Sequence, residues 1–117
     1  MSTELNITID QGETWIKRIT WQDSDGQPYD LTGHTARMMV RRNYADMDKN
    51  PPVVSLDEAD GIELGDSDDN IVITIADTIT ETIRGGVYYW DLELVDSSNV
   101  VTKLLRGKVI VLAEVTR

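Results

Sequence analysis

The sequence predicts an all-β protein, an immunoglobulin-like antiparallel β-sandwich of about eight strands with one short helical turn. Three observations lead to this fold class. Apolar residues recur at every second position in most segments, which is the period of a half-buried strand. Clusters of Asp, Asn and Gly separate these segments at short intervals, and no long helical pattern alternates with them. The chain of 117 residues is also the length of one domain, which we place at residues 1–117.

The first half of the chain contains three alternating segments. Their expected inward-facing residues are Leu5, Ile7 and Ile9, then Trp15, Ile19 and Trp21, then Ala36, Met38 and Val40. The run DSDG breaks the chain after the second segment, and Thr32-Gly33 forms a second bend. The polar stretch from Asn43 to Pro52 is expected to be an exposed loop.

The second half begins with short strands expected at 53–56 and 62–64, on either side of the turn EADG. A further strand after DSDDN has Ile71, Ile73 and Ile75 at alternate positions. ADTITETIRGG is the one helical segment, a single turn with Asp77 or Thr78 as N-cap. Its inward-facing residues are Ile79 and Ile83, and Gly85-Gly86 ends it.

The last part of the chain holds the strongest alternation. In the strand 87–95 the two faces are Tyr88, Trp90, Leu92 and Leu94 on one side and Tyr89, Asp91 and Glu93 on the other. The turn DSSN leads into a strand at 100–106, which Gly107 separates from a last strand at 108–115.

Tyr88 follows a helical turn and opens a late strand. This placement resembles the corner of immunoglobulin-like sandwiches where a tyrosine hydroxyl bonds back to the upstream backbone. The alternative is an amphipathic residue at the margin of a sheet, and the sequence leaves both readings open. The chain has no Cys, so the disulfide of antibody domains is absent.

Two acidic runs were compared with a calcium-binding loop. Such a loop needs oxygen ligands at positions one, three and five, glycine at six and glutamate at twelve. Counted from Asp23, the glycine comes too early and position twelve is His34. Counted from Asp66, position six is Ile71 and a strand follows. We therefore interpret both runs as turn formers and expect no metal site.

No catalytic or cofactor-binding residues are expected. His34 is the only histidine and there is no Cys, so the usual zinc sites lack their ligands. A Ser–His–Asp triad is formally possible, but no G-x-S-x-G motif occurs and the serines lie in turn-like positions. No phosphate-binding glycine motif is present. The formal net charge of −10 argues against nucleic acid as a partner. Because these catalytic and nucleotide-binding motifs are missing, we do not expect an enzyme. No segment matches a secretory signal or a membrane span, so we expect no membrane partner.

The late strands carry apolar residues on both faces, which is typical of a strand that another chain covers. The exposed faces of the strands therefore supply the candidate protein-interface residues. These are Arg37, Arg41, Arg42, Tyr89, Asp91, Glu93, Lys108, Ile110 and Leu112.

Several motifs also resemble a known family. They are an I-x-x-G-E-T-W start, a W-x-D-x-x-G-x-P hairpin, D-L-T-G before A-R-M-x-V-R, the later GIEL, the strand Y-x-W-D-L-E-L and the closing RGKVIVLAEVTR. The chain resembles, over nearly its whole length, the β-sandwich domain of tailed-bacteriophage tail-fibre attachment, tail-collar and baseplate proteins. The family's motif residues are structural, so no catalytic position is transferred.

The resemblance implies a structural virion protein, made in the host bacterial cytoplasm, that assembles as a symmetric homo-oligomer with other phage structural proteins in the tail. One alternative is a head cement or decoration protein that stabilises the capsid. An alternative from another class is a carbohydrate-binding module for host surface glycans, with Trp15, Trp21, Trp90 and Tyr29 as stacking candidates.

Overall fold

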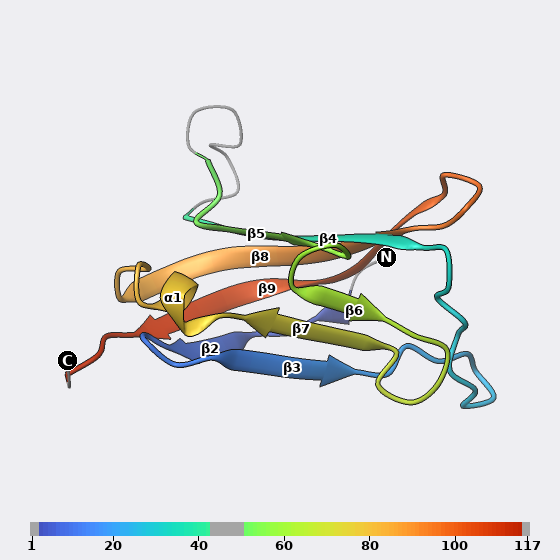
Figure 1. The fold of residues 1–117 in the computed structure, drawn as a ribbon, viewed down its shortest axis with the longest axis horizontal. Helices are drawn as coiled ribbons and strands as arrows, with labels where there is room; N and C mark the ends of the chain where they lie inside the picture. Colours follow the sequence, from blue (N-terminus) through green and yellow to red (C-terminus); the bar gives the residue numbers. More distant parts are fainter. Residues whose placement is uncertain (1–2, 43–50, 116–117) are drawn as a thin grey trace.

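The computed structural model describes residues 3–42 and 51–115 and consists of two β-sheets packed face to face (Figure 1). The described residues form nine strands and one helix. Their bounds are β1 Thr3–Glu4, β2 Ile7–Asp10, β3 Trp15–Ile19, β4 Thr35–Arg41, β5 Val54–Asp57, β6 Ile62–Leu64, β7 Ile71–Ile75, α1 Asp77–Thr80, β8 Gly86–Val95 and β9 Val101–Leu112. The expected loop 43–52 falls mostly on residues 43–50, outside the described residues.

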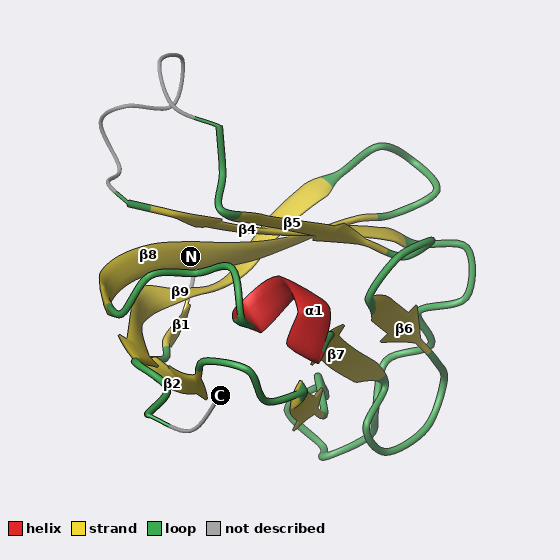
Figure 2. Cartoon of the chain, turned by 60° about the vertical axis from the view of Figure 1, so that its left-hand side comes forward, coloured by secondary structure: helices red, strands yellow, loops and turns green. Residues whose placement is uncertain are grey.

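The order of the strands confirms the immunoglobulin-like sandwich. The large sheet has the order β1-β9-β8-β4-β5, with β2 also on β9, and the small sheet has the order β3-β7-β6. In immunoglobulin domains the second, fifth and fourth strands form one sheet, and the third, sixth and seventh form the other. The same order is found here when β1 and β2 count together as the first strand and β5 as an additional strand, so that β3, β7 and β6 are the second, fifth and fourth. Figure 2 shows α1 at one end of the space between the two sheets. The alternation of apolar residues led to the correct fold class because each strand has one face in a shared core.

The N-terminal edge of the large sheet is not antiparallel. Both β1 and β2 pair with β9 in parallel, with Ile7 beside Val109 and Ile9 beside Val111. The expectation of antiparallel pairing is therefore wrong at this edge. The apolar pattern of β2 specifies only that Ile7 and Ile9 face the core, and either strand direction satisfies that requirement.

The final strand is continuous where the sequence suggested a break. β9 runs through Gly107, so the prediction of separate strands at 100–106 and 108–115 is wrong. A Cβ at Gly107 would lie 2.1 Å from the Leu5 carbonyl oxygen. Gly107 therefore permits a close approach of the N-terminal segment to β9, which is the other common reason for glycine in a strand.

The core is formed by the inward faces of both sheets. The fully buried residues include the expected alternating sets, Ala36, Met38 and Val40 from β4 and Ile71, Ile73 and Ile75 from β7. Trp90 is 1% exposed, and its Nε1–H donates a hydrogen bond of 2.8 Å to the Leu5 carbonyl. This bond satisfies the polar atom of a buried indole and ties the N-terminal segment to the core.

The helix begins without a side-chain cap. Ala76 occupies the N-cap position, so the prediction of Asp77 or Thr78 there is wrong. Thr80, which is fully buried, holds the helix instead. Its hydroxyl donates to the Glu13 carbonyl at 2.8 Å and accepts the Gly12 amide at 3.1 Å. These tertiary bonds fix α1 against the β2–β3 turn.

Tyr88 forms the tyrosine corner. Its hydroxyl donates a hydrogen bond of 2.6 Å to the Arg84 carbonyl, and its ring is buried. Of the two readings open at the sequence level, the structure supports the corner. Trp90 follows two residues later, at the position where antibody domains carry their second cysteine. A buried indole therefore fills the place of the missing disulfide.

Candidate protein-interaction face

The outer surface of the three central strands of the large sheet, β4, β8 and β9, is called the central face below. The strand register and the alternation of burial define its members. They are Thr35, Arg37, Met39, Arg41, Val87, Tyr89, Asp91, Glu93, Val95, Val101, Lys103, Arg106, Lys108, Ile110 and Leu112.

All of the candidate interface residues except Arg42 lie on this central face. The register forms cross-strand rows, of which one joins Arg41, Tyr89 and Lys108. Arg42 lies beyond the end of β4, and its guanidinium is 5.9 Å from the centre of the Tyr88 ring. Because Tyr88 faces the core side of β8, Arg42 turns away from the other candidates.

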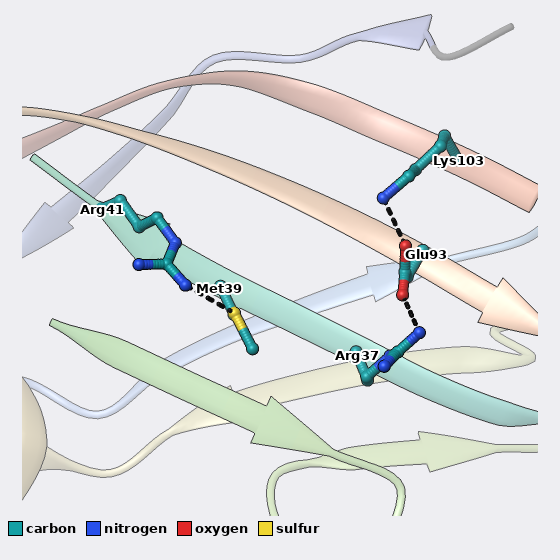
Figure 3. Close-up of polar contacts among 5 residues, drawn as sticks. All are labelled: Arg37, Met39, Arg41, Glu93 and Lys103. Carbon is teal, nitrogen blue, oxygen red and sulfur yellow. Dashed lines mark hydrogen bonds and ion pairs between the residues drawn. The ribbon is translucent and has the colours of Figure 1, made fainter. Parts of the chain in front are cut away.

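One row forms a charged network across three strands. Figure 3 shows Glu93 between Arg37 of β4 and Lys103 of β9, with an ion pair to each. The Glu93 side chain is only 11% exposed, so its charge is largely removed from water. The hydrogen bond from Lys103 holds the pKa of Glu93 below its ordinary value, against the opposing effect of burial. The positive charges of Lys103 and Arg37 also lower this pKa.

A β-bulge places Lys103 in this network. The pairing shifts by one residue between Leu92 and Glu93, so that Glu93 faces Lys103 and Leu104 has no partner in the register. Strict alternation from Arg106 would place Leu104 outside and Lys103 inside. Lys103 is therefore not among the predicted interface residues, since a bulge leaves no mark in a count of alternate residues. Arg106 was also missed, although its spacing of two residues from Lys108 is a signal that could have found it.

Exposed apolar side chains lie at both ends of the central face, with Val101 at the end beside the β8–β9 loop and a larger group at the other. Val87 pairs with Ile110 across the two strands, and Leu112 is the next outward residue of β9. These residues are 55%, 42% and 49% exposed. On the outside of the small sheet, Ile16 of β3 is 49% exposed, among polar neighbours such as Arg18 on its own strand and Thr74 on the paired strand. An exposed apolar group beside charged rows is typical of a protein contact surface.

The charges of the central face differ from those of the chain as a whole. The face carries five cations, Arg37, Arg41, Lys103, Arg106 and Lys108, and two anions, Asp91 and Glu93. Five against two gives +3, on a chain of formal charge −10. The acidic residues Glu4, Asp10 and Asp57 lie at the margins, on the edge strands β1, β2 and β5. The centre is therefore cationic within an acidic molecule.

The acidic loops act as turns, as the sequence indicated. The Asp23 carboxylate accepts the backbone amides of Asp25 at 2.9 Å and Gln27 at 3.0 Å. Among the described residues, no group of three or more Asp, Glu or His side chains could hold a metal ion. In the same part of the chain, no helix is long and apolar enough to cross a membrane.

An open hollow lies between the β5–β6 turn and the helix. Leu56, Ile62 and Ile79 form its apolar lining, and Glu58, Asp60 and Glu63 supply its carboxylates. These three carboxylates are exposed to solvent, and the hollow itself is open. The central face is thus the better candidate for function.

No protein-family model matches this chain, and no curated protein is similar to it in sequence.

Proposed function

We propose that this chain is a structural protein of a tailed-bacteriophage virion, which assembles as a symmetric oligomer in the tail at a collar, baseplate or fibre-attachment ring. The observation that carries this proposal is the central face, where exposed Val87, Ile110 and Leu112 continue into charged cross-strand rows. The tail location rests on the resemblance of the sequence motifs to phage tail sandwich domains.

The central face suits a permanent contact because its backbone is already ordered. β8 is paired on both sides, with β4 and β9, so the side chains project from a hydrogen-bonded sheet. Glu93, Arg37 and Lys103 restrain one another through their ion pairs. A partner that binds such a surface orders few additional groups, which lowers the entropic cost of association.

Binding to the other structural proteins of the virion tests the proposal. The purified chain is incubated with tail proteins and with copies of itself, and complexes are measured by size-exclusion chromatography with light scattering. Leu112→Lys is expected to weaken association about three- to tenfold, because the contact buries the exposed half of the leucine, which is worth about 0.7–1.5 kcal/mol. Ile16→Lys is the matched control, since Ile16 and Leu112 are equally exposed at 49%.

A chain that stays monomeric and binds none of the virion proteins would refute the proposal. Equal loss of binding in both variants would also count against it, because the effect would then not belong to the central face. Electron microscopy of the intact particle, with this chain traced in the map, distinguishes a tail position from a head position as a cement protein.

The burial of the aromatic residues does not favour glycan binding. Trp90 is 1% exposed and lies in the core, so its ring has no face for a sugar. Trp15 and Trp21 pack partly against the same core. Tyr29 is 42% exposed, but its ring lies 4.7 Å from that of Trp21, centre to centre. Of these four stacking candidates only Tyr29 is exposed, so they do not form an open platform of several rings.

A further inference from the structure

Three loops gather at one end of the sandwich, which is called the acidic loop end below. They are residues 20–34 between β3 and β4, residues 65–70 between β6 and β7, and residues 96–100 between β8 and β9, all at the right of Figure 1. Their acidic residues are Asp23, Asp25, Asp30, Asp66, Asp68, Asp69 and Asp96. The same loops contain no Lys or Arg, so the acidic loop end carries a formal charge of −7.

The carboxylates of this end are available to a partner. Asp66, Asp68 and Asp69 are exposed, and Asp25 and Asp30 are exposed in the neighbouring loop. Asp23 and Asp96 accept hydrogen bonds from backbone amides of their own turns, which orders the loops without neutralising their charge. The acidic loop end is thus an ordered anionic surface.

The central face presents the opposite charge. Its cations are more accessible than its anions: the side chains of Arg37 and Lys103 are 55% and 59% exposed, whereas Glu93 beneath them is 11% exposed. Arg106 and Lys108 are also exposed, and Asp91 is half-buried. A partner that approaches the centre of the sheet therefore meets cations first.

These charges distinguish two ways in which copies of the chain can associate. In a face-to-face pair about a two-fold axis, the cationic centre of one copy lies against the cationic centre of the other, and the like charges repel. In a head-to-tail contact, the cationic centre lies against the −7 end of the next copy. The second arrangement brings opposite charges together at every contact.

We infer that the acidic loop end of one copy docks on the central face of a second copy. The two surfaces are different, so the contact is heterologous and continues from copy to copy, as in a ring or a filament. This inference rests on the proposed function, which requires self-assembly, and adds the two surfaces that meet. The apolar side chains Val87, Ile110 and Leu112 lie at one end of the receiving surface and are covered in the contact.

Two charge reversals test the inference in the full chain. Lys108→Glu alters the central face, and Asp68→Lys alters the acidic loop end. Each variant alone is expected to associate about tenfold more weakly than the parent, as measured by sedimentation velocity at low ionic strength. An equal mixture of the two is expected to associate more strongly than either alone, because each supplies the surface that the other lacks.

A matched control separates this contact from a general effect of charge. Glu81→Lys makes the same change in net charge as Asp68→Lys, but Glu81 lies at the end of α1, away from the acidic loop end. It is expected to leave association at the parent level or to strengthen it slightly. Raising the salt to about 1 M, where the Debye length is about 3 Å, is expected to weaken the parent assembly.

The outcomes separate this inference from the proposed function. If Asp68→Lys assembles like the parent, or if the mixture is no stronger than its components, head-to-tail docking is wrong. If the parent does not self-associate but binds tail proteins, the inference and the symmetric homo-oligomer both fail, while the role as a virion protein that binds its neighbours stands. If the parent does neither, the proposed function fails as well.

Discussion

Asn70 joins two distant parts of the chain, and its substitution gives the sharpest test of how the acidic loop end is ordered. The side chain is 1% exposed. Its Oδ1 accepts the Trp21 amide at 2.8 Å, and its Nδ2 donates to the carbonyls of Trp21 and Tyr29, both at 2.9 Å. One buried amide therefore holds both strands of the 21–29 hairpin.

Replacing Asn70 with Ala removes all three hydrogen bonds. At about 1 kcal/mol each, the loss in the free energy of unfolding is about 3 kcal/mol. The entropy of unfolding is roughly 2.1 cal/mol/K per residue, or about 250 cal/mol/K for this chain of 117 residues. The melting temperature is therefore expected to fall by about 12 °C.

Urea denaturation and calorimetry measure this loss, and hydrogen exchange locates it. The Trp21 amide, which donates to Asn70, is expected to lose protection first. Asp68→Ala is the control in the same loop, because Asp68 is exposed, and its cost is expected to stay within about 0.5 kcal/mol. A loss below about 1 kcal/mol for Asn70→Ala, with the Trp21 amide still protected, would refute the reasoning.

Three further substitutions test other parts of the fold. Tyr88→Phe removes the bond to the Arg84 carbonyl and is expected to cost about 1–2 kcal/mol, measured by urea denaturation. Glu93→Gln is expected to flatten the acid limb of the stability profile. Because the folded pKa of Glu93 is lowered, its stabilisation is present above the unfolded pKa of about 4.3 and is lost as the pH falls through the folded pKa. Denaturation midpoints between about pH 6 and pH 2 measure this slope. Gly107→Ala is expected to displace the N-terminal segment, because its Cβ would lie 2.1 Å from the Leu5 carbonyl oxygen, and hydrogen exchange of residues 5–10 detects the displacement.

Each of these substitutions has a control or a contradicting result. Tyr29→Phe, on a tyrosine that is 42% exposed, is expected to change stability by less than about 0.5 kcal/mol. Gly65→Ala is expected to be mild, since the nearest atom to its Cβ would lie 4.0 Å away. An unchanged acid limb in Glu93→Gln would mean that the ion pairs of Glu93 contribute nothing to folding.

Much of the fold could be predicted because alternation reports burial directly. The inward sets of β4, β7 and β8 are the ones expected, and Tyr88 was recognised as a corner candidate from its place after a helical turn. The N-cap prediction was wrong because Ala76, one residue earlier, occupies that position. Thr80 holds α1 through contacts with residues 12 and 13, about 70 positions away in the chain. No local pattern could indicate those contacts.

The candidate face was predicted in part. Tyr89, Asp91 and Glu93 share a face because they alternate along one strand, and the sequence contains that information. Lys103 was missed because the bulge in β9 changes which of its residues face outward. Arg42 lies apart from the other candidates, since it follows the end of β4 and its guanidinium lies over the Tyr88 ring.

The sequence by itself determined which side of each strand is apolar, and from that the all-β class. It also determined that the acidic runs form turns, because Asp, Asn and Gly act through their own backbone. Only the tertiary structure decided the parallel partner of β2, the role of Asn70, and the separation of a cationic face from an acidic end. The physical reason is the separation along the chain of the residues involved. The alternation of buried residues and the conformation of turns depend on a few neighbouring residues. Strand partners and surface charge depend on distant residues that the packing of the whole sandwich brings together.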